Sequence, residues 1–191
     1  MTNSTASLAT KHTLYSQARD SIRTGDLLAW RITRSTSVFD FILVLYQKLF
    51  KANFSHVAVA VWVGNRLFAV EATPSKVRII PLSMLDHFYR IPANIPSNEK
   101  HFDILARYVG RPYSLWDLVK VLLGFKGSDT SLYCSELALQ YYDEIGYFTD
   151  HVDEFDDHIP TPDDIVERVL AQSKSAIEYV RIDKGNLDDR L

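Results

Sequence analysis

The stretch HVAVAVWVGNRLFAVEA, residues 56–72, decides the fold that this sequence predicts. Residues 56–63 are apolar at nearly every position, which is typical of a strand in the middle of a sheet. Gly64-Asn65 fits a two-residue hairpin turn, and residues 66–72 then return as the neighbouring strand. Residues 76–81 follow as a third strand, after a turn at Pro74. The centre of the protein is therefore predicted to be an antiparallel sheet.

The register of this hairpin brings two polar residues together. If Gly64-Asn65 is the loop, Ala58 faces Glu71, and His56 shares the sheet face of Ala58. His56 and Glu71 are then diagonal neighbours, roughly 7–8 Å apart at the backbone. An acid in an apolar strand is seldom buried without a partner. The pair suits a carboxylate that orients an imidazole, and the alternative is an ion pair with a purely structural role.

Outward from the hairpin, turn and helix signals place the remaining elements. Gly25 opens a short strand at 27–31, and a short helix from Ser83 leads into an edge strand at 88–91 that Pro92 ends. Thr161-Pro162-Asp163-Asp164 is a strong helix start, with a cap, Pro at the first position and acids in the first turn. Helices are expected at 37–50, 98–109 and 115–125, from a cap at Ser131 to Gly146, and at 161–173, with a last strand at 177–182. Strands followed mainly by helices indicate an α+β protein.

Composition limits the classes of function. The 191 residues suit a single domain, which we place at 23–183, after a flexible segment 1–22 and before a loose tail 184–191. A net charge of −3 without a dense basic patch argues against nucleic acid as a partner. The single cysteine excludes an internal disulfide and a Cys-rich zinc site.

Nothing in the sequence predicts a membrane segment or a signal peptide. The first twenty or so residues lack the apolar core that a signal peptide needs. The longest apolar stretch, 38–50, is interrupted by polar residues and is too short to span a bilayer. A cytoplasmic or a phage- or virion-associated protein is expected, and the oligomeric state stays open.

The cysteine lies in the stretch SLYCSELALQYY, residues 131–142, which reads as the start of a helix. Ser131 is the expected cap, and Gly146 the expected left-handed end. Cys134 then falls in the first turn, where unpaired N–H groups and the helix dipole favour a thiolate. If Cys134 is a nucleophile, it needs a base nearby. The alternative is that Cys134 is a small buried residue of the hydrophobic core.

Six segments together resemble the permuted papain-like amidases, the circularly permuted relatives of NlpC-type cell-wall peptidases. They are Gly25-Asp26-Leu27-Leu28, Ser55-His56, Val70-Glu71-Ala72, Gly110-Arg111-Pro112-Tyr113, Tyr133-Cys134-Ser135-Glu136-Leu137 and Thr161-Pro162-Asp163-Asp164. The resemblance implies a permuted papain-like fold with the nucleophile at a helix N-terminus. It further implies Cys134 as nucleophile, His56 as base, Glu71 as the residue that orients His56, and Tyr113 near the oxyanion site. The Cys-Ser-Glu-Leu segment is closer to the hydrolases than to the acyltransferases of the wider group.

The expected function is a cysteine hydrolase that cleaves an amide through an acyl-enzyme, with no metal or cofactor. Its substrate would be a peptide, a peptidoglycan-type amide, or another small-molecule or lipid-like acyl compound. The acidic stretch 150–158 could mimic a metal site, but a solvated loop fits its spacing better. Two rival functions stay open. One is an acyltransferase or lipid hydrolase that uses the same three residues, with 38–50 and 115–125 lining an acyl site. The other is a non-catalytic binding module.

Overall fold

The structure is a computed structural model that describes residues 11–31, 52–96, 98, 100–112, 133–148 and 160–183. Several expectations lie outside the described residues. These are the helices at 37–50 and 115–125, the acidic stretch 150–158, the tail 184–191 and the oxyanion candidate Tyr113.

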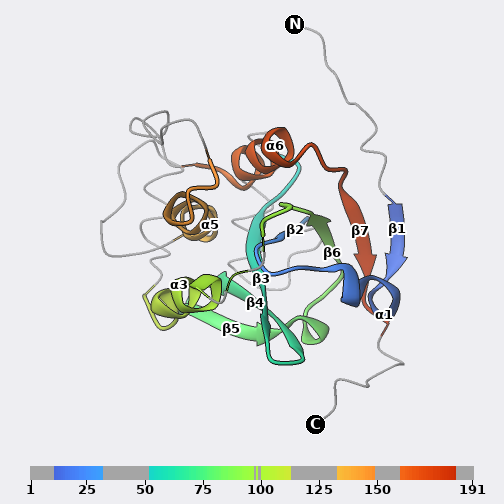
Figure 1. Ribbon diagram of the computed structural model, residues 1–191, viewed down its shortest axis with the longest axis horizontal. Helices are drawn as coiled ribbons and strands as arrows, with labels where there is room; N and C mark the ends of the chain where they lie inside the picture. Colours follow the sequence, from blue (N-terminus) through green and yellow to red (C-terminus); the bar gives the residue numbers. More distant parts are fainter. Residues whose placement is uncertain are drawn as a thin grey trace, which may run out of the picture.

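The protein is α+β, and its centre is a mixed sheet of seven strands in the order β1-β7-β6-β2-β3-β4-β5 (Figure 1). The one parallel pair in this order is β1 with β7, so the sheet is not wholly antiparallel as expected. The strands are β1 (Lys11–Leu14), β2 (Leu27–Trp30), β3 (His56–Val63), β4 (Arg66–Ala72), β5 (Val77–Pro81), β6 (Phe88–Ile91) and β7 (Glu178–Arg181).

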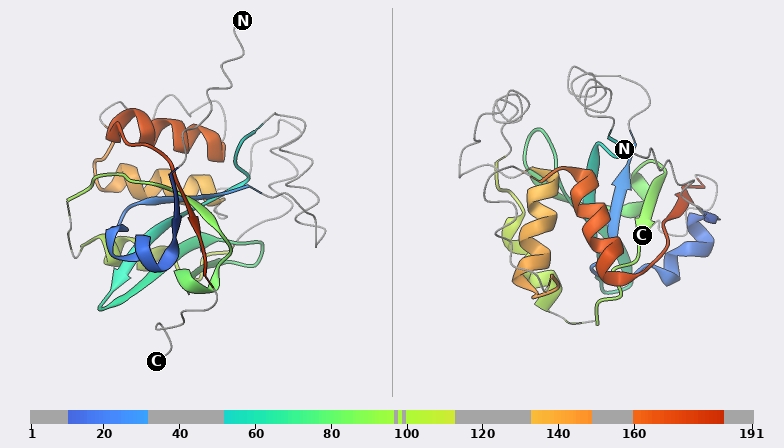
Figure 2. Two further views of the ribbon diagram at one scale, coloured as in Figure 1. Left: turned by 90° about the vertical axis from the view of Figure 1, so that its right-hand side faces the viewer. Right: turned by 90° about the horizontal axis from the view of Figure 1, so that it is seen from above.

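Helices cover both faces of this sheet. Side chains of α3 (Lys100–Tyr108), α5 (Cys134–Glu144) and α6 (Pro162–Ser173) share one core with alternate residues of β2, β3 and β4. The other residues of those strands pack against α1 (Tyr15–Ala18) on the opposite face. Figure 2 shows α5 and α6 side by side over one face of the sheet. Short 3₁₀ turns η1 (Arg19–Ser21) and η2 (Leu82–Met84) complete the described elements. Among these elements, no helix is long and apolar enough to cross a membrane.

The central hairpin has the predicted register. The ladder between β3 and β4 runs from Val63 opposite Arg66 to Val59 opposite Val70. Gly64 makes the turn with a φ of 59°, in the left-handed region that a tight hairpin loop requires. Because strand residues alternate between faces, this register determines where His56 and Glu71 lie.

The β6–β7–β1 side of the sheet differs from the prediction. Strand β6 lies between β2 and β7, so it is an internal strand and not an edge strand. Residues 11–22, expected to be flexible, form β1, α1 and η1, and bury Tyr15, Ala18 and Ile22. The cause is long-range pairing. Residues of β1 lie beside residues of β7 far along the chain, and no local pattern announces that contact.

Helix α5 begins at Cys134, two residues later than a cap at Ser131 predicted. Its N-cap is Tyr133, not Ser131, and the carboxylate of Glu136 accepts the Tyr133 N–H at 3.4 Å. Its C-terminus is as predicted. The N–H of Gly146 bonds to Asp143 O and that of Tyr147 to Tyr142 O, which is a Schellman ending. Helix α6 also begins as predicted, with Thr161 as N-cap and Pro162 in the first position.

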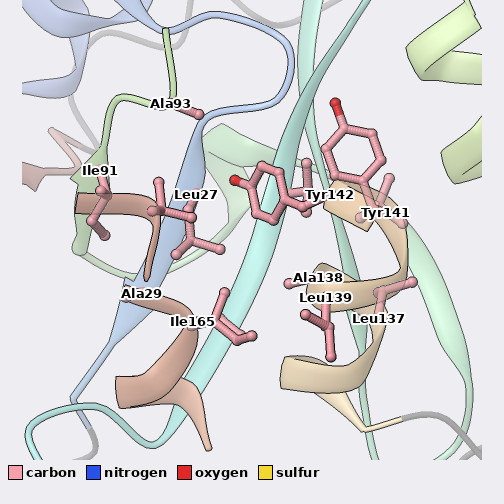
Figure 3. Close-up of a cluster of buried hydrophobic side chains, with 14 of the residues drawn as sticks. Leu27, Ala29, Ile91, Ala93, Leu137, Ala138, Leu139, Tyr141, Tyr142 and Ile165 are labelled. Carbon is pink, nitrogen blue, oxygen red and sulfur yellow. The ribbon is translucent and has the colours of Figure 1, made fainter. Parts of the chain in front are cut away.

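The inner face of α5 is fixed to the sheet by apolar and polar contacts. Its buried Leu137, Ala138 and Tyr142 lie among residues of β2, β6 and α6 (Figure 3). The hydroxyl of Tyr142 donates to the carbonyl oxygen of Gly25 at 2.8 Å. Gly25 itself has a φ of 91°, and a Cβ there would lie 2.9 Å from both Ile95 Cδ1 and Tyr141 Oη. The glycine before β2 therefore allows α5 to pack closely on the chain.

This close approach gives a stability prediction. We expect Gly25→Ala to lower the free energy of unfolding by roughly 1–3 kcal/mol more than Gly64→Ala does, because overpacking adds to the backbone strain. Gly64 is the matched control, since it also has a positive φ but has nothing within 4 Å of the added Cβ. Urea unfolding of both variants measures the difference. Equal losses would mean that Ile95 and Tyr141 move aside without cost.

Candidate active site

His56 and Glu71 meet at one end of the central hairpin. His56 is the first residue of β3 and Glu71 is the penultimate residue of β4, so both lie beyond the last ladder pair, Val59 with Val70. His56 Nε2 is 2.7 Å from Glu71 Oε2. The side chains are 17% and 5% exposed, so the contact is largely shielded from water. The predicted diagonal pair is present.

Arg78 extends this pair on the side away from His56. The β4–β5 register places Arg78 directly opposite Glu71. Its Nη2 and Nε lie 2.6 Å and 2.8 Å from Glu71 Oε1. The sequence analysis did not identify Arg78. The register after the turn at Pro74 would have found it, because Ala72 opposite Val77 sets the next pair as Glu71 with Arg78.

Cys134 reaches this group from the first position of α5. Contacts between α5 and both β3 and β4 hold the start of the helix at the sheet. The charge of His56 acts on the Cys134 sulfur, as do backbone groups of Val57 and Ser135, so these groups lie close together. Since Glu71 occupies Nε2 of His56, Nδ1 is the ring nitrogen left for proton exchange with the sulfur. The structure thus brings together three of the four predicted site residues, and the fourth, Tyr113, lies outside the described residues.

The electrostatics of the group favour an ion pair. Burial alone would raise the pKa of Cys134, but the charge and the hydrogen bond of His56, and then the two backbone hydrogen bonds, lower it. Burial alone would lower the pKa of His56, but Cys134 and then Glu71 raise it to about 10. These opposing shifts favour the state in which the Cys134 proton has moved to His56, a thiolate beside an imidazolium.

Glu71 is the fixed anion of the group. Burial opposes its charge, but the hydrogen bond and charge of His56, and after them those of Arg78, lower the pKa of Glu71 to about 2. Its carboxylate therefore stays ionised at any pH well above 2, so the imidazolium of His56 has an anionic partner there. A proton held on His56 Nε2 points at this carboxylate, which leaves Nδ1 for exchange with Cys134.

The chain that enters β3 is held by the N-terminus of α6. Asp163 accepts the N–H groups of Asn53 and Phe54 at 2.7 Å and 2.8 Å. On the other side, the Trp30 ring packs beside His56 with ring centroids 5.5 Å apart. The Thr161–Asp164 motif was expected only to start a helix, yet its Asp163 also positions the backbone that precedes His56.

A metal site is a separate question. Within the described residues, no group of three or more His, Cys, Asp or Glu side chains is placed to hold a metal ion. The chemistry that the described side chains can offer is that of a nucleophile, a proton carrier and an orienting anion.

Comparison with known proteins gives little further information. No family model matches the chain. No curated protein matches it either. Among solved structures, the chain is similar to a crystal structure of the metalloprotein yiiX from Escherichia coli O157:H7. The TM-score is 0.49 at 21% sequence identity, over 82% of this chain and 88% of that one.

Proposed function

We propose that the protein is a cysteine hydrolase that cleaves an amide bond through an acyl-enzyme, on a circularly permuted papain-like fold. The observation that carries the proposal is Cys134 at the first position of α5, close enough to His56 for each to shift the pKa of the other, while His56 Nε2 is 2.7 Å from Glu71. A thiolate beside an imidazolium, with a third group orienting the ring, is the arrangement of an activated nucleophile.

The first half of the reaction forms the acyl-enzyme. The Cys134 thiolate attacks the carbonyl carbon of the substrate, and the C=O electron pair moves onto oxygen. When this oxyanion collapses, the C–N bond breaks and the imidazolium of His56 gives its Nδ1 proton to the departing nitrogen. The products are a free amine, a thioester on Cys134 and a neutral His56.

The second half returns the enzyme to its starting state. Neutral His56 takes a proton from water, whose oxygen attacks the thioester carbonyl. The S–C bond then breaks, the carboxylic acid leaves, and the thiolate and imidazolium are restored. The backbone N–H of Cys134 lies in the first turn of α5, where N–H groups have no acceptor within the helix, and it is the proposed donor to the oxyanion in both halves. Tyr113 stays the proposed second donor.

A peptide or peptidoglycan-type amide is the proposed substrate class. The support is the likeness of Cys134-Ser135-Glu136-Leu137 to the hydrolases of the permuted group. The N-terminus of α5, with its positive dipole, also suits the anionic transition state of acyl transfer from an amide.

The test is a panel of muropeptides, N-acyl amino acids and phospholipids, incubated with wild type and with Cys134→Ala. We expect Cys134-dependent release of an amine from a muropeptide or N-acyl substrate, and a transient acyl adduct on Cys134 by intact-protein mass spectrometry. Ser16→Ala is the matched control, because that residue bonds Asp183 far along the sheet from Cys134.

Each other outcome has a defined meaning. Cys134-dependent cleavage of phospholipids alone would overturn the amide proposal in favour of a lipid hydrolase. Transfer of the acyl group to an added amine, in place of hydrolysis, would assign an acyltransferase. Binding of a panel member without any Cys134-dependent turnover would leave a binding module.

A further inference from the structure

Glu71 divides its two oxygens between two cations. Oε2 is 2.7 Å from His56 Nε2, while Oε1 receives two N–H groups of Arg78, from Nε at 2.8 Å and Nη2 at 2.6 Å. Two donors on one oxygen and one on the other fix the plane of the carboxylate. A carboxylate held by His56 alone could rotate about its last bond, because nothing else described here bonds to Oε1.

The two partners of Glu71 differ in their exposure to water. The Glu71 side chain is 5% exposed and that of His56 is 17% exposed, whereas Arg78 is 45% exposed. A carboxylate buried this deeply and deprived of one partner must either take up a proton or turn toward another donor. Either response weakens the acceptor that His56 Nε2 needs. Arg78 thus influences the His56–Cys134 pair through Glu71.

We propose that Arg78 is a positioning residue of this site, which holds Glu71 as an oriented anion and thereby preserves the thiolate–imidazolium pair at acidic pH. The inference rests on the proposed function, since it assigns Arg78 a role in the same group. Arg78 acts through Glu71, so it touches neither the substrate nor the sulfur.

The competing role for Arg78 is direct contact with a substrate, since almost half of its side chain faces water. The two roles differ in a measurable way. A positioning residue loses its influence once Glu71 can no longer act, whereas a substrate contact keeps its influence whatever stands at position 71. A measurement without substrate also responds only to the positioning role.

The experiment is the rate of Cys134 alkylation by iodoacetamide between pH 4 and pH 9, for wild type, Arg78→Gln, Arg78→Lys, Glu71→Gln and the Arg78→Gln/Glu71→Gln double variant. Lys76→Gln is the matched control, because it removes an exposed charge of the same sign just before β5. We expect Arg78→Gln to shift the pH midpoint of alkylation upward by about one unit, which slows alkylation about tenfold at pH values below the wild-type midpoint.

The pattern across the variants decides between the two roles. Arg78→Lys should recover part of the loss, since lysine keeps the charge but not the paired N–H groups. In the Glu71→Gln background, Arg78→Gln should have no further effect. A wild-type profile for Arg78→Gln, an additive loss in the double variant, or an equal loss in Lys76→Gln would each overturn the inference.

The result is also separable from the proposed function. Iodoacetamide needs no substrate, so the expected alkylation pattern together with an inactive substrate panel would keep Arg78 as a positioning residue and reject the hydrolase. An ordinary thiol profile in wild type would overturn both. Far-UV circular dichroism of each variant shows whether it is folded. If Arg78→Gln does not fold, Arg78→Lys carries the test.

Discussion

We expect His56→Ala to slow the alkylation of Cys134 by iodoacetamide at pH 6 by about 10²-fold. An ordinary thiol with a pKa near 8.5 is only about 0.3% thiolate at that pH. In the wild type, burial raises the pKa of Cys134 but the charge of His56 lowers it below its ordinary value, so more of the sulfur is thiolate than in the variant, and this thiolate is lost as the pH falls through the lowered pKa. The expected ratio is somewhat smaller than the difference in thiolate population, because thiolates of low pKa are weaker nucleophiles.

The pH dependence of this effect has a definite sign. The two rates should converge as the pH rises above about 8.5, where even an ordinary thiol is ionised. His87→Ala is the control, since His87 accepts a hydrogen bond from the Ile182 N–H and is remote in sequence from the β3–β4 hairpin. Identical profiles for wild type and His56→Ala would remove His56 from the assignment.

On the proposed function, we expect Glu71→Gln to lower kcat by about 10²-fold or more while the protein stays folded. The reason lies in the two donors of Arg78, which require an acceptor at the position of Oε1. The glutamine therefore turns its amide oxygen to Arg78 and its NH₂ group to His56 Nε2. The NH₂ group of the glutamine is a donor, so Nε2 can pair with it only as an acceptor. The ring therefore carries its proton on Nδ1 and none on Nε2. The ring is then in the wrong tautomer to receive a proton from Cys134.

Steady-state kinetics on the substrate that the panel identifies measure this loss. KM should change little, because Glu71 is buried behind His56 and the loss falls on the chemical steps. Glu144→Gln is the matched control, because Glu144 pairs with the exposed Arg107 at the other end of α5. A loss confined to KM would instead assign Glu71 to substrate binding.

The pairing of His56 with Glu71 could be predicted because it depends only on local chemistry. A two-residue turn at Gly64-Asn65 leaves one register, and strand alternation then decides which side chains share a face. Arg78 needed one more step of the same reasoning, across the turn at Pro74. Both pairings stay within a span of the chain where few alternative pairings exist.

The positions of β6 and β1 could not be predicted in this way. Phe88–Ile91 has the composition of a strand whether or not a neighbour covers it, and Pro92 suggested an edge. The neighbour that makes it internal, Glu178–Arg181, lies about ninety positions further along the chain. Prediction of the site was limited in the same way, by contacts between distant parts of the chain. The first turn of α5 is readable from the residues around Cys134, but its approach to His56 follows from packing among distant elements, above all the contact of Tyr142 with Gly25.

The place of β7 between β6 and β1 has a consequence for how the chain folds during synthesis. Until Glu178–Arg181 has left the ribosome, β6 carries an unpaired edge, and Arg90 lacks the carboxylate of Glu178 that lies 3.0 Å away in the finished protein. Lys11–Leu14, synthesised before the other described strands, must wait for the same strand. Such pairings of high sequence separation form slowly. A nascent chain therefore completes the hairpin with His56 and Glu71 early, but closes its sheet only after Glu178–Arg181 has been synthesised, and a chaperone that shields β6 in that interval would raise the yield of folded protein.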